Sequence, residues 1–473
     1  MVEVPAHLPP TAGELRPENR CSRLKVALRG IPESGRIRAK KTWIALPGRA
    51  MTLCRSLETE RVGDVLGDIR YCLAFMNIEK VLSQRTLAMS GSGIRRAFEL
   101  GAKLQDPINL SIGQPDFPVA RSVKDAAIHA INSDRNGYSL SRGIPELNSR
   151  LAEKLSNDFG WSFAATGGQS DIIVTPGTSG ALVLAAMATL NPGDEIVIPD
   201  PYFVLYPAMA SLTDAKPIYC DTYPDCKMTA ARVEKCITPR TKMVVMNSPG
   251  NPGGVVNTAE ECRELLELCR RKNVLLLSDE IYDEFTYSDA RTQNSVNVEK
   301  EPALKCPSPA RFPGAEENVL LVRGFGKTYG NTGWRLGYAA GPKKLIEQMI
   351  KLQQFSFVCA PTPLQWGAIA ALDVDCTLQI QEYQKRRDMV VQALGPITGL
   401  KAPGGAFYAF PKIPEKLGMT GLQFLEAAIE RNVILVNGGT FSQRDSHFRL
   451  SYAVPVHKLE AGLEVLTKLL SGK

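Results

Sequence analysis

Residues 318–327, Asn318-Val-Leu-Leu-Val-Arg-Gly-Phe-Gly-Lys327, contain the stretch that decides the fold of this chain. The apolar run is short and continuous, which is typical of a strand covered on both faces of a parallel sheet. Two glycines and a lysine follow it at once, and Arg335 comes eight residues after the lysine within a second glycine-rich turn. A lysine at a strand end can be merely solvated, so its role depends on the rest of the chain.

Six more runs of the same kind occur in the chain, and helical stretches such as 258–272 separate several of them. Strands that alternate with helices form parallel sheets with helices on both faces. We therefore predict an α/β fold with a mostly parallel sheet of about seven strands. The six runs are 171–175, 195–199, 217–220, 242–247, 273–278 and 334–340.

A different texture follows Lys343, where a long helical stretch leads to a smaller C-terminal α+β region. Strands are expected there at 405–411 and 447–453, and helices near 421–431 and 456–470. The expected organisation has four parts. They are an N-terminal extension over 1–75, an N-terminal arm and small-domain segment over 76–110, a large domain over 111–343, and a small domain over 344–473.

The chain has 473 residues, of which 44% are apolar and 22% charged, as in an ordinary globular protein. Its net charge of +7 is concentrated in residues 1–75, where 13 Lys/Arg and 8 Asp/Glu give +5. The rest carries only +2, so a nucleic-acid partner is not expected. No apolar run approaches the roughly 20 residues that span a bilayer, so no membrane segment is expected.

Residues 1–75 lack long apolar periodicity and show no signal-peptide pattern. They form either a dispensable, poorly ordered segment or the product of a start codon assigned too early, with Met76 as the initiator. At Met76 the spacing becomes helix-like and continues through residues 94–100. The eleven cysteines are scattered without a C-x-x-C pair, which favours reduced thiols and a cytoplasmic location. With only four histidines, we expect no metal centre.

The segment from Arg323 to Tyr338 resembles the active-site lysine motif of the class I/II aminotransferases. These are fold-type I enzymes that depend on pyridoxal 5′-phosphate, and the aspartate aminotransferases are among them. Other motifs of the family follow in the expected order from about Met76 to Lys473. The resemblance thus covers nearly 400 residues.

This resemblance implies three catalytic residues. Lys327 would bond covalently with the cofactor aldehyde and then move the substrate proton, a role that a depressed amine pKa favours. Asp279, at the end of an apolar strand, would keep the pyridine nitrogen protonated. Tyr282, three residues further on, would donate to the phenolic oxygen of the cofactor.

The same resemblance assigns the remaining cofactor contacts. Asn251, in Asn247-Ser-Pro-Gly-Asn251-Pro-Gly-Gly254, would be a second donor to the phenolic oxygen; Gly253 stands where the family usually has threonine. The strand–helix turn at Gly177, Thr178 and Ser179 would bind the phosphate through backbone amides, as helix N-termini do. Further contacts are expected from Arg335 and Tyr138 to the phosphate, the latter across a subunit interface, and from the ring of Phe203, with Tyr202 as the alternative, to the pyridine.

Arg449, in Phe448-Arg449-Leu-Ser-Tyr-Ala453, resembles the family arginine that grips the substrate α-carboxylate in a bidentate pair. Gly113 and Asn251 would line the same pocket. Two departures matter. Gly324 replaces a serine that often binds phosphate, and Ser179 replaces a lysine that some relatives place in the phosphate loop, which weakens a strict aspartate specificity.

The implied function is an aminotransferase that moves an amino group from an α-amino acid to a 2-oxo acid, by default 2-oxoglutarate, through a ping-pong cycle. The expected active unit is a homodimer with shared sites. A C–S β-lyase of the same fold would use the same residues and stays open. A non-catalytic regulator is disfavoured, because no helix-turn-helix pattern precedes the domain. The amino donor stays open among aspartate, alanine, aromatic and aliphatic amino acids.

Overall fold

A computed structural model describes residues 77–89, 104–291 and 306–472, together with residues 91, 93, 99 and 101. The chain divides into two units, 1–82 and 83–473. The extension predicted over 1–75 lies outside the described residues, and so does most of the helix expected over 94–100. In the first unit, the described part contains a short 3-10 helix, η1 (Ile78–Lys80). All that follows concerns the second unit.

A seven-stranded sheet in the order β2-β8-β7-β6-β5-β3-β4 forms the centre of this unit. Only β8 runs antiparallel to its neighbours, so the predicted mostly parallel sheet is confirmed. Each predicted strand is present, with ends that differ by at most two residues. The strands are β2 (Ser170–Pro176), β3 (Glu195–Asp200), β4 (Lys216–Asp221), β5 (Thr241–Asn247), β6 (Leu275–Asp279), β7 (Val319–Gly324) and β8 (Leu336–Pro342).

Two of the strands begin two residues later than the sequence predicts, and both shifts have a backbone cause. Asn273 ends the preceding helix in the left-handed conformation (φ 52°), so β6 starts two residues further on. Arg335 likewise has a φ of 54° after the 3-10 turn η5 (Thr332–Trp334), and β8 starts at Leu336. Apolar periodicity alone does not show such single-residue turns.

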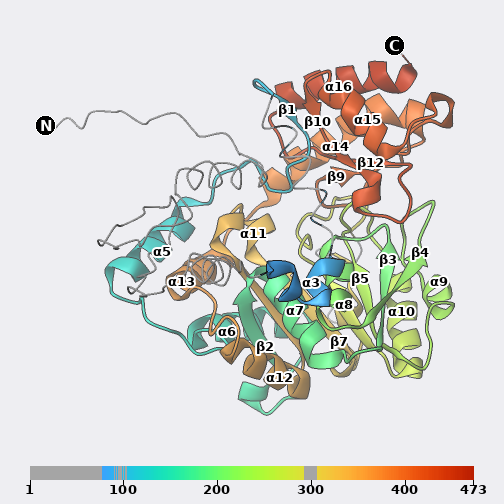
Figure 1. Cartoon of the computed structure of the whole chain (residues 1–473). Helices are drawn as coiled ribbons and strands as arrows, with labels where there is room; N and C mark the ends of the chain where they lie inside the picture. The colour runs from blue at the N-terminus through green and yellow to red at the C-terminus, as the bar shows by residue number, and fades with distance from the viewer. Residues whose placement is uncertain are drawn as a thin grey trace, which may run out of the picture. The chain divides into compact units, whose positions relative to one another are not determined.

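Helices cover both faces of the sheet (Figure 1). Along β2, Ile173 packs into the core on one face and Val174 into the core on the other, because successive strand side chains point to opposite sides. The first face is covered by α7 (Gly177–Thr189), α8 (Leu205–Leu212) and α12 (Lys343–Gln354). The second is covered by α5 (Arg121–Asn132), α6 (Pro145–Phe159), α10 (Ala259–Lys272) and α13 (Thr362–Ala371).

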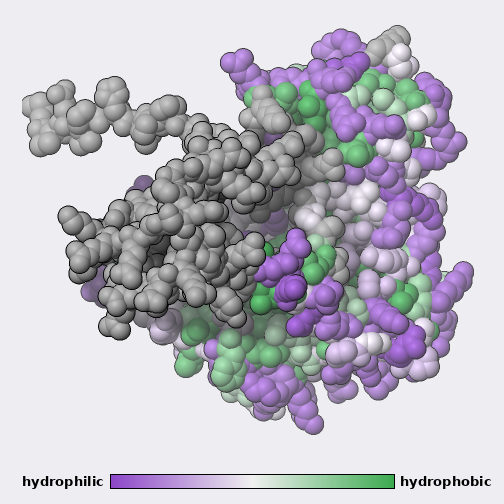
Figure 2. Space-filling model, viewed as in Figure 1, coloured by the Kyte–Doolittle hydropathy of each residue, from purple (hydrophilic) through white to green (hydrophobic). Residues whose placement is uncertain are grey.

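The helix α10 shows how local sequence sets an element. Thr258 and Glu261 form a reciprocal capping box at its start, and basic residues fill its last turn. One stripe, which includes Leu265 and Cys269, is buried, while the charged side chains face outward. On the face shown in Figure 2, the surface over α9 (Ala230–Glu234) and α10 is mainly hydrophilic.

The C-terminal region has its own core of aromatic and aliphatic side chains. Its antiparallel sheet has the order β11-β12-β9, and a parallel pair joins β1 to β10 (Figure 1). The long helical stretch predicted after Lys343 is three helices, because Pro361 starts a new helix and a turn at 372–376 starts another. The elements are β1 (Ile108–Asn109), β9 (Tyr408–Ala409), β10 (Val433–Ile434), β11 (Val436–Asn437), β12 (Phe448–Ser451), α14 (Thr377–Thr398), α15 (Gly421–Ile429) and α16 (Val456–Ser471), and a short α3 (Gln84–Ala88) precedes them all.

Within the described ranges, no helix combines the length and apolarity needed to cross a membrane. The eight cysteines of these ranges are all free thiols.

Candidate active site

Polar side chains gather at one edge of the seven-stranded sheet, where β2, β3, β5, β6 and β7 end and the antiparallel β8 begins. The register places Asp279 beside Asn247 and Gly324 beside Gly337 at this edge. In open α/β sheets, ligands bind outside the carboxyl ends of the strands. The topology thus brings together residues that are more than 150 positions apart in the chain.

Lys327 lies one turn beyond β7, in the four-residue helix α11 (Phe325–Thr328). Its Nζ donates a hydrogen bond to the carbonyl oxygen of Gly113. Burial lowers the pKa of this amine to about 8, with further lowering by the positive charges of Arg449 and Arg335. With this pKa, about a tenth of the amine is unprotonated at pH 7, far more than for an ordinary lysine, which makes it a better nucleophile and proton acceptor.

Asp279 ends β6 and is 2% exposed. Its Oδ2 accepts a hydrogen bond of 2.8 Å from the hydroxyl of Tyr206, on α8, and its Oδ1 accepts one of 3.3 Å from the backbone of Ile281. Burial raises the pKa of this carboxyl to about 6, although the Tyr206 bond opposes the rise. A buried carboxylate without a cationic partner is costly, so this position is suited to a ligand that brings a proton or a positive charge.

Tyr282, 3% exposed, is the next polar group along this edge. Its hydroxyl lies 3.1 Å from that of Tyr408, on β9, and burial raises its pKa well above the ordinary value. A side chain at Gly113 would place a Cβ 2.7 Å from the Tyr408 hydroxyl, so a glycine keeps this space open.

Arg449, on β12, is 1% exposed and lies between two aromatic rings. Its guanidinium carbon is 4.5 Å from the ring centroid of Tyr408 and 4.6 Å from that of Phe441. Nη1 donates to Asn251 Oδ1 at 3.1 Å and Nη2 to the Ser111 carbonyl at 2.8 Å, while the buried Nε has no partner. Burial lowers the pKa of this guanidinium, and one donor of this buried cation is unused.

Asn251 is held by the turn that follows β5. Its backbone N–H donates to Asn247 Oδ1 at 2.8 Å, and Asn247 Nδ2 donates to the Asp279 carbonyl at 2.9 Å. These bonds fix the turn to the end of β6. Asn251 is thereby connected to both Asp279 and Arg449.

The turn from β2 into α7 forms an anion cradle. The backbone N–H groups of Gly177, Thr178 and Ser179 begin the 13-residue helix, and no side chain caps them. A Cβ on Gly177, whose φ is 73°, would lie 2.6 Å from Arg335 Nη2, so the guanidinium is held against this turn. The free amides, the helix dipole and the arginine together favour a phosphate-sized anion.

The structure also explains why position 324 is a glycine. A Cβ there would lie 2.9 Å from the Thr178 methyl carbon and 2.8 Å from Ile281 Cδ1. The Thr178 and Ile281 side chains thus fill the space that the family's serine would need. The sequence showed that the serine is missing, but it did not show which side chains occupy its space.

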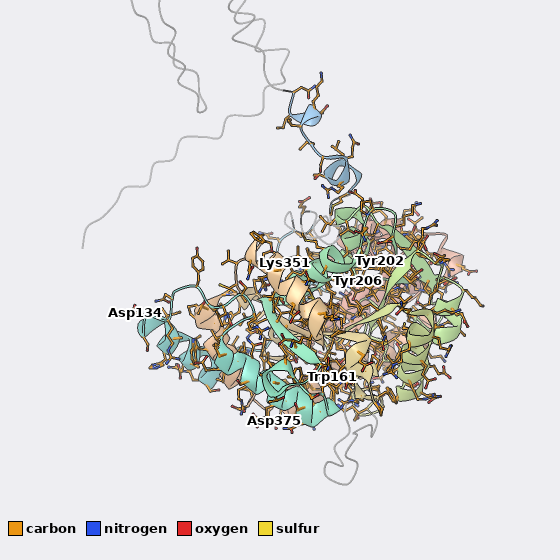
Figure 3. The ribbon with its side chains drawn as sticks, turned by 90° about the horizontal axis from the view of Figure 1, so that it is seen from below. Asp134, Trp161, Tyr202, Tyr206, Lys351 and Asp375 are labelled. Atoms are coloured by element: carbon orange, nitrogen blue, oxygen red, sulfur yellow. The ribbon has the colours of Figure 1, made fainter. Side chains whose placement is uncertain are left out.

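The two aromatic candidates lie at different depths. Phe203 follows β3, with its ring edge-on to Tyr206 at 5.7 Å between centroids. Tyr202 is buried and binds the C-terminal region, since its N–H donates to the Phe441 carbonyl at 2.7 Å. Tyr202 and Tyr206 lie close together in Figure 3. Tyr138 is not gathered into the site: its side chain is 88% exposed.

Sequence reasoning missed three residues that complete the site: Tyr206, Tyr408 and Phe441. The signal for Tyr206 was local, because it lies three residues after Phe203, one helical turn further. Tyr408 and Phe441 gave no comparable signal, since their contacts with Arg449 arise only when β9 and the turn after β11 pack around β12.

Four features meet at the carboxyl edge of one sheet: a lysine with a lowered pKa, a buried carboxylate, an anion cradle and a buried arginine. Together they define an enzyme that processes a carboxylate-bearing substrate. Residues 105–466 match the family model "Aminotransferase class I and II". The chain belongs to this family and is a transaminase of fold type I.

Named relatives agree with this assignment. The chain is 33% identical over 410 residues to an aspartate aminotransferase of Geobacillus stearothermophilus (84% of this chain, 100% of the relative). It is 32% identical over 403 residues to aromatic-amino-acid aminotransferase 2 of Thermococcus litoralis (83% and 99%). The solved aspartate aminotransferase of Thermus thermophilus with maleate is 33% identical, with a TM-score of 0.72, over 82% of this chain and 99% of that one.

Proposed function

We propose that this chain is a pyridoxal 5′-phosphate-dependent aminotransferase that moves the amino group of an α-amino acid to a 2-oxo acid, with 2-oxoglutarate as acceptor, by a ping-pong mechanism. The observation that carries the proposal is the pairing of Lys327, whose pKa is lowered to about 8, with the buried Arg449 and its unused Nε. Lys327 can accept a proton from the substrate, and Arg449 can hold the carboxylate of that substrate.

The residues present fit the cofactor. Asp279 offers a buried carboxylate for a protonated ring nitrogen, and the α7 turn with Arg335 offers a cradle for a phosphate. Tyr282 and Asn251 offer donors for a phenolic oxygen, and Phe203, next to Tyr206, offers an aromatic ring. Pyridoxal phosphate, when bound, supplies an aldehyde that takes up the amino group and a ring that withdraws electrons from the substrate Cα.

In this proposal, Arg449 orients the substrate. Its flat faces are covered by Tyr408 and Phe441, so a carboxylate can approach only along the edge of the guanidinium, where Nε is free. Such an approach gives two parallel charge-assisted hydrogen bonds. Because the carboxylate is fixed, the Cα–H bond points to one side of the site.

Lys327 then moves the proton at its Nζ. Burial, together with the positive charges of Arg449 and Arg335, lowers its pKa to about 8, which suits a group that must accept a proton and return it in the same cycle. The hydrogen bond to the Gly113 carbonyl holds the amine at the wall of the substrate pocket. Asp279 provides the negative charge for the ring nitrogen of the proposed cofactor.

The proposed active unit is a homodimer in which Tyr138 serves the partner's site. Tyr138, Leu140 and Phe355 are 88%, 60% and 87% exposed. Their segments are adjacent, because Ser139 N–H donates to Thr362 Oγ1 at 3.1 Å and Gln353 donates to the Ser141 carbonyl. Exposed apolar side chains gathered in one patch mark an interaction surface.

The amino donor is open among dicarboxylic, aromatic and aliphatic amino acids. Ser179 occupies the place where some relatives have a lysine, so that cation does not select a second carboxylate here. The named relatives include both an aspartate and an aromatic-amino-acid enzyme.

The test is a panel of amino acids with 2-oxoglutarate and pyridoxal phosphate, followed as glutamate formation. Wild type and Lys351→Ala, an exposed lysine on α12, should both be yellow and active. Lys327→Ala should bind the cofactor reversibly and lose at least about a thousandfold in rate. Full activity of Lys327→Ala would overturn the proposal, as would release of pyruvate and ammonia without need of an acceptor, which is the signature of a lyase.

A further inference from the structure

A cavity of about 500 Å³ lies outside the candidate active site. One wall is formed by Tyr223, after β4, and the others by segments of the C-terminal region around Lys412, Arg444 and His447. Its volume falls within the range of small-molecule sites, about 300–1,000 Å³. None of its lining residues belongs to the set that faces Lys327.

A chain of three aromatic rings in contact, His447, Phe410 and Phe441, lies between this cavity and Arg449. The His447 ring lies parallel to that of Phe410, with centroids 5.0 Å apart and an angle of 11°. Phe410 meets Phe441 edge-on at 6.4 Å, and Phe441 covers one face of the Arg449 guanidinium. Because this wall is filled by side chains, the cavity is a separate site and not a branch of the active site.

We propose that this cavity binds a small aromatic monocarboxylate. The proposal goes beyond the transaminase function and does not depend on it. It rests on two features of the lining: aromatic rings that can stack with a ligand, and cations that can bind a single carboxylate.

The ring surfaces come from Tyr223 and His447, whose centroids are 5.0 Å apart. Burial lowers the pKa of His447 to about 4, with Lys412 and Arg444 adding to the effect, so its ring is neutral at physiological pH. A neutral imidazole presents a flat, uncharged surface for stacking. Ile413, Pro414 and Met419 add apolar area to the same lining.

The cations are Lys412 and Arg444. Lys412 Nζ lies 2.7 Å from Glu415 Oε1, and Arg444 pairs with Asp221, but all four side chains are about half exposed or more. Exposed pairs of this kind contribute little, so they do not hold the cations away from a ligand. Among the lining residues, two positive charges oppose the single negative charge of Glu415. Because Asp221 also pairs with Arg444 from outside the lining, little positive charge is left over, which suits one carboxylate better than a phosphate or a dicarboxylate.

Arg444 also connects the two features. Its guanidinium carbon is 4.5 Å from the ring centroid of Tyr223. A ligand whose ring stacks beside Tyr223 would therefore have its carboxylate within reach of Arg444, which forms bidentate pairs with such groups.

The experiment is calorimetric titration of the full-length, cofactor-loaded protein with indole-3-carboxylate. We expect saturable binding of one molecule per chain. Indole, which lacks the carboxylate, and cyclohexanecarboxylate, which lacks the aromatic ring, should each bind at least about tenfold more weakly. Saturable binding of all three with equal affinity would overturn the proposal, as would no binding of indole-3-carboxylate below about 10 mM.

Variants locate the binding. The double variant Lys412→Gln/Arg444→Gln should weaken indole-3-carboxylate binding at least about tenfold. The matched control Lys416→Gln/Arg431→Gln removes two exposed charges from the same region outside the lining and should leave it unchanged. Arg449→Lys should also leave it unchanged. Loss of binding in Arg449→Lys together with retention in Lys412→Gln/Arg444→Gln would place the ligand in the active site and overturn the proposal.

Discussion

The two ends of the candidate active site bury opposite charges in different ways. At one end, Asp279 is surrounded by its own sheet: β5, β6 and α8 supply its neighbours, and its side-chain partners are Tyr206 and the backbone of Ile281. At the other end, Arg449 contacts Ser111, Asn251, Tyr408 and Phe441, which come from four separate segments of the chain.

Both ends carry a buried charge that no side chain of opposite charge neutralises within the described residues. Burial raises the pKa of Asp279 and lowers that of Arg449, so each charge is less stable than it would be in water. Each is therefore poised for a ligand group of the opposite charge. The difference is that the anion lies in one compact part of the fold, whereas the cation depends on the packing of the C-terminal region against the turns of the large sheet.

The largest effect is expected at the anionic end. Asp279→Asn should slow the half-reaction roughly a thousandfold, about 4 kcal/mol, because the ring nitrogen of the proposed cofactor loses the charge that keeps it protonated. Stopped-flow absorbance with a single amino donor measures this rate. Asp134→Asn, at an exposed position, is the control and should behave as wild type. A loss below tenfold would mean that another residue supports this end.

The cationic end should respond through substrate binding. Arg449→Lys keeps the charge but loses the planar fork, so kcat/KM should fall about a hundredfold, close to 3 kcal/mol. The affinity for pyridoxal phosphate should stay within a few-fold, since its proposed contacts lie elsewhere. Arg431→Lys, on an exposed arginine, is the matched control. An unchanged kcat/KM would show that the carboxylate binds another group.

A third prediction concerns the free energy of unfolding, which the raised pKa of Asp279 should change by about 2–3 kcal/mol. The folded-state pKa of Asp279 is about 6, above the ordinary value of 3.8, so its contribution to stability is present below the unfolded pKa and is lost as the pH rises through 6. In cofactor-free protein at about pH 7.5, Asp279→Asn should therefore raise the free energy of unfolding, although the same change slows the cofactor-loaded enzyme.

Urea unfolding at several pH values checks this result. The advantage of Asp279→Asn over wild type should shrink as the pH falls from about 7 toward 4. An Asp279→Asn protein that is less stable than wild type at neutral pH would contradict the buried-charge explanation.

A smaller effect is expected at Tyr206. Tyr206→Phe removes the 2.8 Å hydrogen bond that holds the pKa of Asp279 down, so the acidic limb of the pH–rate profile should move to higher pH. The rate at neutral pH should fall about tenfold, in line with about 1.5 kcal/mol for a hydrogen bond to a charged group. Tyr202→Phe is the comparison, since the Tyr202 hydroxyl accepts from Gln443 and not from Asp279. Equal profiles for both variants would exclude Tyr206 as the support of Asp279.

The smallest effect should follow removal of residues 1–75. Every group at both ends of the site lies between Ser111 and Arg449, so activity and assembly should stay within twofold of the full chain. Size-exclusion chromatography and the same assay provide the measurement. Insolubility of the shortened protein would show that the extension belongs to the structure.

The sequence could predict the anionic end well. The strand 273–278, the Asp279 that follows it, and the lysine after 318–323 lie on or next to continuous apolar runs, whose burial follows from local composition. The seven strands and their mostly parallel arrangement were predictable for the same reason. The ends of β6 and β8 were not, because single residues in the left-handed conformation set them.

By itself, the sequence determined the order of strands and helices, the family motifs and the candidate side chains, because these depend on short-range apolar patterns and on residue types at fixed spacings. Only the tertiary structure decided what surrounds Arg449, that Tyr206 supports Asp279, and that the side chains of Thr178 and Ile281 fill the space beside Gly324. The physical reason is that burial, pKa and packing depend on the neighbours in space. Those neighbours are up to 338 positions apart in the chain, as between Ser111 and Arg449.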